Sequence, residues 1–336
     1  MDVIVPNPVL VKKKGDPHPY FVKLLEEAMR KKQEPCFTEQ LMIGPPETEW
    51  KQFCQPLLRR CPLLLGDVEK GSWKLLDKGM DACVWKFRTM GHWRTLKVFW
   101  DNEVPPVTNY WAFQRECHNA TTLQAIEAAA EKATGTEGIW IHGQPKTHRQ
   151  AVENLYAFSH QGSQKGRLKE VPGAIPFTAA SIPRFKKCFG WLRVSCKELM
   201  ELDGSSYPEL YRADKEMRQM RRDQEYYSIV YEFIPEGENR LEAVQFQIDF
   251  FHRMGFSFCI SPRCQNWTDS VLVDYSEIVS PGGYGWSRGL FERGVPATSQ
   301  LNMRFIGPLP KPEGWDESDS YDTESSESDD EDQKQT

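Results

Sequence analysis

The sequence predicts an α+β fold in which a strand-rich region is followed by helices and one short buried strand. Three observations lead to this prediction. Residues 73–99 alternate apolar and polar side chains and are rich in β-branched and aromatic types, which is typical of antiparallel strands. Residues 109–132 carry an apolar stripe at helical spacing. A second helical pattern, at 241–254, leads into an irregular loop and a short apolar strand.

The composition is that of a soluble globular protein, with 39% hydrophobic and 12% aromatic residues in a chain of 336. Its nine cysteines form no CxxC pair, which indicates a reducing compartment and argues against a disulfide framework or a structural zinc site. No apolar run approaches the roughly 18 residues that a membrane-spanning helix needs. At the N-terminus the charges follow the apolar residues, opposite to a signal peptide. We therefore expect a nuclear or cytoplasmic protein without membrane contact.

Charge is concentrated at the C-terminus. Residues 313–336 hold 11 of the 48 acidic residues and a single base, Lys334, so the net charge of −6 arises from this segment. A block of acids and serines cannot bury enough apolar surface to offset its ordering entropy, which predicts a disordered acidic tail. Two interpretations stay open: a solubilising tail, or an interaction tail that is phosphorylated at the serines and threonines among its acids.

Before the first strands, residues 1–70 are expected to form an N-terminal extension with one or two helices, at Pro19–Lys32 and Glu47–Arg60. The strands of 73–99 should turn around Gly91. After the long helix, residues 133–181 are interpreted as an insertion with one short helical patch, AVENLYAF.

The middle of the chain predicts two further strands, CFGWLRVS at 188–195 and a buried strand at 226–234 that ends at Pro235 and Gly237. Between them, residues 207–224 are interpreted as a charged helix that carries Lys215, Arg218, Arg221 and Arg222 on one side. Acids lie among these bases, which favours a solvated face over a nucleic-acid patch. Gly255 is expected to end the helix of 241–254.

Residues 249–278 have the spacing of a phosphotransferase catalytic loop. In that pattern a helix leads to H-x-D-x-x-x-x-N, and a hydrophobic strand then delivers a metal-binding Asp. Asn266 stands in the Asn position and Asp274 in the metal-Asp position, but Ser261 stands where the base Asp is required. Earlier in the chain, Lys97 lies in a predicted strand and Glu116 follows 19 residues later on the predicted helix. That order and separation suit a phosphate-binding lysine and its ion-pair partner.

Taken together, these motifs resemble the protein-kinase-like fold. The resemblance implies two lobes: a kinase-like N-lobe at 71–235, which contains the insertion at about 133–181, and a C-lobe at 236–312. The C-lobe is truncated, because only about 38 residues separate Asp274 from the acidic tail. The resemblance also implies a vestigial nucleotide site made by Gly79, Lys97, Glu116 and Glu232, with Asn266 and Asp274 as its metal-binding positions.

Five runs narrow the resemblance further: GMDACVWKFR, TLKVFW, CFGWL, IVYEFIPEG and QNWTDSVLVDYSEI. Over about residues 70–280 they resemble the fungal kinetochore Sim-four complex subunit family. This resemblance implies a kinase-like protein with little or no catalytic activity, located in the nucleus at a kinetochore and working through protein partners.

Three signs argue against phosphoryl transfer. A serine at position 261 is a poor base near neutral pH. Asp77, Gly79 and Ala82 occupy the three positions of the glycine loop, so that one glycine remains and a carboxylate replaces another. The third sign is the short C-lobe. We therefore expect no cofactor and an interaction or assembly module.

The alternative is an atypical ATP-dependent phosphotransferase that binds magnesium and uses Asp249 or Asp269 as its base. A third interpretation needs no ligand, since Lys97 and Glu116 can form a purely structural ion pair. A cysteine nucleophile at Cys259 or Cys264 is less favoured, because no histidine with a suitable context accompanies it. The run PGGYGWSRG at 281–289 is interpreted as packing rather than as a nucleic-acid surface, so direct nucleic-acid binding is not expected.

Overall fold

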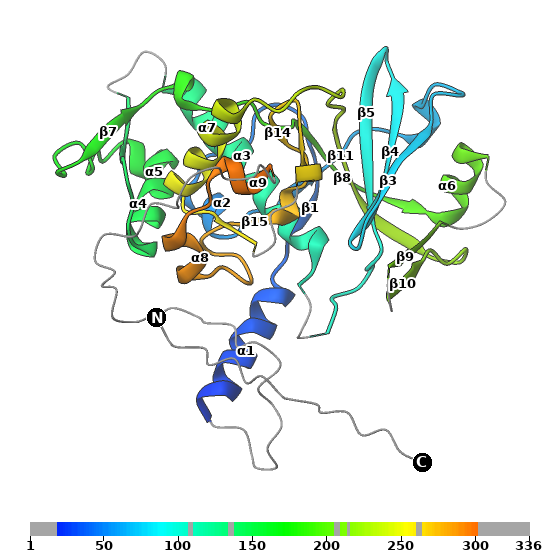
Figure 1. Cartoon of the computed structure of the whole chain (residues 1–336), viewed down its shortest axis with the longest axis horizontal. Coiled ribbons are helices and arrows are strands. Elements are labelled where there is room, and N and C mark those ends of the chain that lie inside the picture. The colour runs from blue at the N-terminus through cyan, green and yellow to red at the C-terminus, as the bar shows by residue number, and fades with distance from the viewer. Residues whose placement is uncertain are drawn as a thin grey trace, which may run out of the picture. The chain divides into compact units, whose positions relative to one another are not determined.

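A mixed seven-stranded sheet forms the centre of the computed structural model, which describes residues 19–106, 110–133, 138–204, 209–213, 216–259 and 264–301 (Figure 1). The strand order is β1-β2-β8-β11-β5-β4-β3. The pairs β1–β2 and β2–β8 are parallel and the other pairs are antiparallel. The strands are β1 Phe37–Leu41, β2 Leu58–Arg60, β3 Lys74–Lys78, β4 Ala82–Thr89, β5 His92–Phe99, β8 Cys188–Ser195 and β11 Glu225–Glu232.

Nine α-helices and four two-stranded ladders complete the described part of the chain, which confirms the α+β class. The helices are α1 Pro19–Gln33, α2 Trp50–Cys54, α3 Ala112–Lys132, α4 His148–Phe158, α5 His160–Ser163, α6 Cys196–Asp203, α7 Leu241–Arg253, α8 Arg288–Arg293 and α9 Ala297–Gln300. The ladders pair β6 Ile139–His142 with β7 Ala174–Phe177, β9 Leu210–Ala213 with β10 Glu216–Gln219, β12 Ser257–Phe258 with β15 Ile278–Val279, and β13 Trp267–Thr268 with β14 Val271–Leu272.

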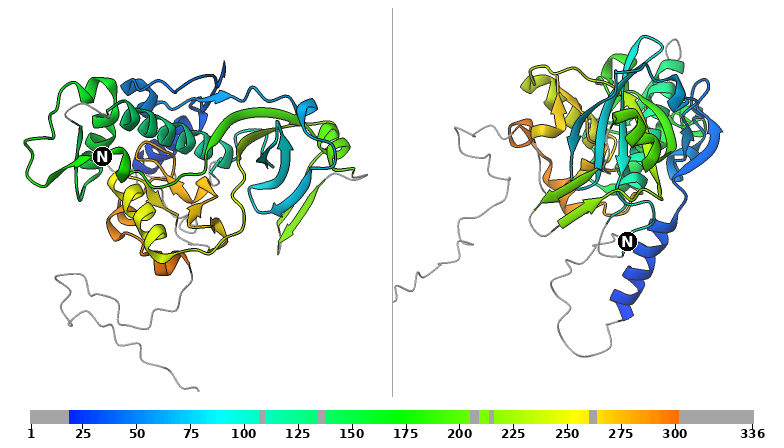
Figure 2. Two further views of the ribbon diagram at one scale, coloured as in Figure 1. Left: turned by 90° about the horizontal axis from the view of Figure 1, so that it is seen from above. Right: turned by 90° about the vertical axis from the view of Figure 1, so that its right-hand side faces the viewer.

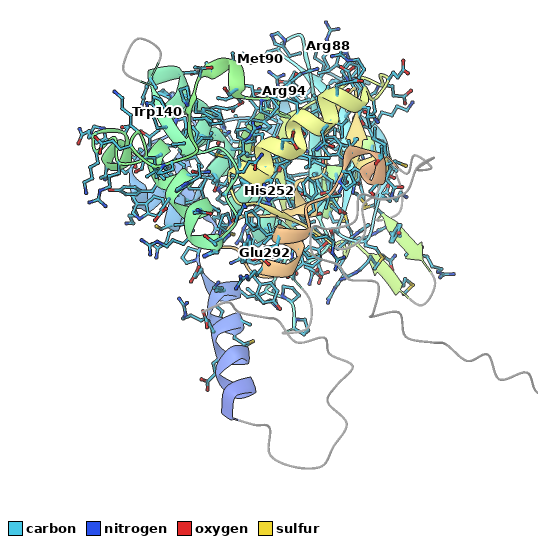
Figure 3. All side chains as sticks on the ribbon, turned by 60° about the vertical axis from the view of Figure 1, so that its left-hand side comes forward. Arg88, Met90, Arg94, Trp140, His252 and Glu292 are labelled. Carbon is cyan, nitrogen blue, oxygen red and sulfur yellow. The ribbon has the colours of Figure 1, made fainter. Side chains whose placement is uncertain are left out.

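The predicted hairpin between β4 and β5 is confirmed, and its turn lies at Met90 and Gly91. Both residues have positive φ, 50° and 77°, which is the conformation of a two-residue turn that matches the twist of the flanking strands. Trp85 and Phe87 of β4 are buried with Leu96 and Val98 of β5 in one apolar cluster. Met90 itself is exposed at the tip, beyond Arg88 (Figure 3).

Helix α3 is buried on nearly all sides rather than along one stripe. It packs against β2, β8, β15 and the 3-10 turn η5 Tyr275–Glu277, so that it lies between the sheet and the segments that follow α7 (Figure 2). Its polar residues bind backbone groups there: Asn119 Nδ2 donates to the carbonyls of Tyr275 and Ile278 at 2.8 and 2.7 Å. A helix that is apolar or hydrogen-bonded all round is a core element.

One predicted helix is shorter than expected and a second is replaced by strands. Within Glu47–Arg60 only Trp50–Cys54 is helical, and Leu58–Arg60 adds a strand to the main sheet. The charged segment 207–224 contains the β9–β10 hairpin, in which Arg218 pairs across with Tyr211. The helical spacing of the charges misled the prediction, because the partner of Arg218 lies in a distant segment: Arg218 Nη1 reaches Asp101 Oδ1, after β5, at 2.8 Å.

The insertion is ordered to a greater extent than its sequence predicts. Helices α4 and α5 lie between β6 and β7 in the sequence, and these two strands pair with each other. Leu155, Phe158 and Phe177 of this segment pack into the main core. Helix α6 was not predicted, although Ser195 and Glu198 form a capping box and Gly204 closes the helix in the left-handed region. Of the remaining ladders, β13–β14 directly precedes Asp274 in the sequence, and β12–β15 joins the strands before and after this segment.

The described residues belong to one compact unit. None of the helices within them is long and apolar enough to cross a membrane. Residues 1–18 of the expected N-terminal extension, Ser261 and the acidic tail at 313–336 lie outside the described residues.

Candidate functional site

Lys97 lies at the centre of a buried charge cluster. It belongs to β5, beside Ile229 of β11 and Val84 of β4, and only 6% of its surface is exposed. Its ammonium forms ion pairs with Glu116 Oε1 and, at 2.8 Å, with Asp274 Oδ1. Burial opposes the charged form, but the two carboxylates outweigh it and raise the pKa of Lys97, so the lysine is charged.

Glu116 is fully buried on α3 and is held from two sides. Besides Lys97, it accepts a hydrogen bond at Oε2 from the Tyr231 hydroxyl at 2.7 Å. Burial raises the pKa of Glu116, and the neighbouring Lys97 ammonium counteracts that effect. Tyr231 comes from β11, so one carboxylate links the sheet to the helix through two strands.

Asp274 is the N-cap residue of the 3-10 turn η5 and directly precedes it. Its Oδ1 accepts hydrogen bonds from Ser276 N at 2.9 Å and from Ser276 Oγ at 2.7 Å, in addition to the Lys97 ion pair. Burial alone would raise the pKa of Asp274, but Lys97 and the two Ser276 donors hold it well below its usual range. The aspartate is therefore ionised, and at least one of its oxygens is engaged by this chain's own donors.

A second buried lysine, Lys186, lies in the same cluster and was missed from the sequence. Its ammonium donates to the Val273 carbonyl and lies 3.6 Å from the centroid of the Tyr231 ring. Burial lowers the pKa of Lys186 to about 8, although Glu116 and Asp274 favour its charged form. Two lysines and two carboxylates thus balance one another. The sequence signal for Lys186 is weak: it is the first of two lysines that precede the buried strand β8.

The turn between β3 and β4 brings a third carboxylate to this cluster. Asp81 Oδ2 accepts hydrogen bonds from the Tyr110 hydroxyl at 2.5 Å and from Ser276 Oγ at 3.3 Å. Ser276 Oγ therefore lies between Asp81 and Asp274. Arg115 of α3 stacks on Tyr110, 3.8 Å from the ring centroid, and donates to the Ser276 carbonyl at 3.0 Å. These contacts hold the turn against η5.

The other expected site residues lie away from the Lys97–Glu116–Asp274 contacts. Gly79 belongs to the same turn, where its carbonyl accepts from Trp100 Nε1 at 2.9 Å. Glu232 ends β11 and pairs with Arg184 at 3.2 Å. Asn266 is buried, and its Nδ2 has no hydrogen-bond partner among the described residues. Its carbonyl accepts from Val273 N at 2.8 Å, so its shown role is in the backbone of the β13–β14 hairpin.

The candidate bases and nucleophiles have other partners. Asp269 pairs with Arg184 at 3.2 Å, and Asp249 accepts from Gln245 at 2.7 Å on its own helix. Burial raises the pKa of the Cys259 thiol, which opposes a thiolate nucleophile. His252 stacks on Phe291 at 4.6 Å between ring centroids, which is a packing contact (Figure 3).

Chemically, the cluster places ionised carboxylates beside two buried lysines. Magnesium prefers several carboxylate and water oxygens in octahedral geometry. No group of three or more His, Cys, Asp and Glu side chains in metal-binding proximity occurs in the part of the chain that the structure describes. Asn266 and Asp274 remain the residues that would hold such an ion.

Comparison with known proteins identifies no relatives for this chain. No protein-family model matches it, and neither a curated protein nor a solved structure is significantly similar.

Proposed function

We propose that this chain is a divergent kinase-like protein that works as an interaction or assembly module and not as a phosphotransferase. The kinase-like part of the proposal is supported by connectivity. In protein kinases a strand lysine pairs with a glutamate on the following helix, and a later strand delivers the metal-binding Asp. Lys97 on β5, Glu116 on α3 and Asp274 after β14 follow the same order and meet in one cluster.

The observation that carries the non-catalytic part is the position of Asp81. In a nucleotide site the turn above the metal Asp offers backbone N–H groups to phosphates. Here that turn directs a carboxylate to Ser276, which also binds Asp274. A phosphate brought to this place would meet Asp81 and Asp274 together, and like charges at such separations repel one another strongly away from water.

The alternative, a phosphotransferase with another base, has weaker support. Asp269 is paired with Arg184, and Asp249 is hydrogen-bonded within α7. Each of these carboxylates therefore has a partner of its own, away from the Lys97–Glu116–Asp274 contacts.

The resemblance to the fungal kinetochore Sim-four complex subunit family points to a particular kind of assembly. It suggests a nuclear protein that contacts other subunits through its surface. The support for this step is the resemblance of the runs given above, so the cellular role is tested separately from the chemistry. Imaging of the tagged protein in dividing cells of its host gives that test: a signal at centromeres supports the role, and a signal excluded from the nucleus contradicts it.

The chemistry is tested by comparing the wild-type chain with Lys97→Met and Asp274→Asn. We expect wild type to transfer no phosphate from radiolabelled ATP to itself or to a co-purifying partner. We also expect variants that remain folded by circular dichroism to retain that partner. Phosphate transfer that disappears in both variants would support the phosphotransferase instead. An Asp249→Asn and Asp269→Asn pair would then identify its base.

A further inference from the structure

The insertion carries a basic, partly aromatic cavity that is separate from the Lys97 cluster. Its volume is about 310 Å³, at the lower end of the range for ligand pockets. Apolar side chains of Trp140, Tyr156, Leu168 and Val171 make much of its lining, together with Arg149 and Arg167. Trp140, which Figure 3 labels, comes from β6. Arg149 and Tyr156 come from α4, and Arg167, Leu168 and Val171 come from the loop after α5.

The charges around the cavity are mostly positive, in a protein whose net charge is −6. Between residues 138 and 173 there are five Lys and Arg but only two Asp and Glu. The Arg149 side chain is 88% exposed, and Lys165 and Arg167 are exposed as well. Lys165 Nζ lies 6.0 Å from the centroid of Tyr156, a cavity-lining ring. The cavity therefore has an apolar floor and a basic rim.

Among the described residues that line the cavity, the single carboxylate, Glu153, is already paired with a positive charge. Glu153 binds His142 Nε2 at 2.9 Å and Arg149 Nε at 3.0 Å. Arg167, by contrast, makes no ion pair with any residue that the structure describes. An anionic partner would consequently find at least one unpaired guanidinium at the edge of an apolar cavity.

We propose that this cavity docks an acidic peptide segment of a partner protein, with one aromatic or large aliphatic side chain inserted and carboxylates on the rim. Basic residues beside an apolar pocket are how proteins hold acidic recognition segments. A nucleic acid fits less well, because base-stacking sites use a continuous basic groove that follows the phosphates. Here the bases stand at the rim of a compact apolar cavity that Leu168 and Val171 help to line.

This inference specifies a surface for the interaction role proposed above and rests on that role. Its test is independent of nucleotide. The probe is a fluorescein-labelled peptide in which one phenylalanine is flanked by aspartates and glutamates, titrated with the full chain in an anisotropy assay. We expect saturable binding that weakens as salt rises. Replacing the phenylalanine with serine should weaken binding about tenfold, since a buried aromatic ring contributes more than 1 kcal/mol.

Three protein variants complete the test. Lys165→Glu combined with Arg167→Glu should weaken binding about tenfold or more. Ser163→Trp, at the cavity wall, should reduce the phenylalanine peptide to the affinity of the serine peptide. The control, Lys197→Glu on α6, reverses an exposed charge away from the cavity and should change nothing.

The proposal would be overturned if the Lys197→Glu control and the Lys165→Glu/Arg167→Glu variant bound the phenylalanine peptide with equal affinity. It would also be overturned if the wild-type chain bound the phenylalanine and serine peptides equally well. Tighter binding of a single-stranded oligonucleotide than of the peptide would assign the surface to nucleic acid instead. Binding that develops only after the acids of 313–332 are neutralised would assign it to the chain's own acidic segment. Phosphate transfer from ATP, the result that contradicts the proposed function, affects none of these outcomes.

Discussion

The Lys97 ammonium lies 2.8 Å from Asp274 Oδ1, although 177 residues separate them in the sequence. The same ammonium contacts Glu116, so one strand lysine joins the sheet, helix α3 and the 3-10 turn η5. In an enzyme, phosphates and metal ions would share these groups. Here Ser276 and Tyr231 donate hydrogen bonds to the two carboxylates, and Lys186 adds a second buried lysine beside them.

The first prediction concerns the ion pair itself. Lys97→Met should lower the free energy of unfolding by roughly 3–5 kcal/mol, because it leaves Glu116 buried and uncompensated. Adding Glu116→Gln should recover at least about 1 kcal/mol of that loss, since contacting residues are coupled. Urea unfolding measures both. Lys197→Met, at an exposed helical ion pair, should cost under about 0.5 kcal/mol. A Lys97 variant as mild as this control would contradict the structural role.

The second prediction concerns the turn that carries Asp81. Tyr110→Phe removes the 2.5 Å hydrogen bond to the Asp81 carboxylate and should cost roughly 1–3 kcal/mol. Tyr211→Phe is the matched control, because the Tyr211 hydroxyl makes no hydrogen bond within the described residues, and it should be nearly neutral. Thermal unfolding compares the two. If both variants have the melting temperature of wild type, the Tyr110–Asp81 hydrogen bond does not stabilise the turn.

A pH dependence should arise from Glu127 on α3. Burial, reinforced by Glu131, raises its pKa to about 7, against roughly 4.3 in an unfolded chain. The folded state therefore binds the proton more tightly, and this contribution to stability is present below about pH 4.3 and lost as the pH rises to 7. Glu127→Gln should stabilise the protein at pH 7.5 by about 1–3 kcal/mol and leave it unchanged near pH 4.5. Equal effects at both pH values would refute this assignment.

Gly190 provides a prediction about the sheet. Its φ is +107°, and a Cβ added there would lie 2.5 Å from the Arg59 carbonyl oxygen, at the junction of β2 and β8. Gly190→Ala should therefore destabilise the protein by about 2 kcal/mol or more. At Gly282 the backbone is ordinary and nothing lies within 4 Å of an added Cβ, so Gly282→Ala should be neutral or slightly stabilising. Chemical denaturation of both variants checks the difference.

The parts of the fold with strong local periodicity could be predicted from the sequence. The β4–β5 hairpin, α3, β8, β11 and α7 lie where alternation or helical spacing places them. The β9–β10 hairpin could not be predicted in this way, because its charges suit a helix equally well and the pairing of Arg218 with Asp101 depends on a distant segment. Likewise β2 is three residues long, and its partner β8 lies about 130 residues away.

For the site, order and spacing in the sequence indicated Lys97, Glu116 and Asp274, and the structure brings these three together. Lys186 belongs to no motif, and Asp81, although it lies in the run GMDACVWKFR, was not identified as a site residue. Each reaches the cluster through tertiary contacts alone, Lys186 across the Tyr231 ring and Asp81 through Ser276. Neighbours such as Lys186 and Asp81 change the charge around the motif residues. The spacing of residues in the sequence does not show that they lie there.

The most direct test of the account is the effect of millimolar Mg-ATP on thermal unfolding of the full chain. Binding at 100 times the dissociation constant would add about 2.7 kcal/mol to the free energy of unfolding. The account predicts no shift for wild type, because Asp81 and Asp274 present two carboxylates where phosphates would lie. A concentration-dependent rise in melting temperature that Asp274→Asn abolishes would contradict it, and would make the cluster a working nucleotide site.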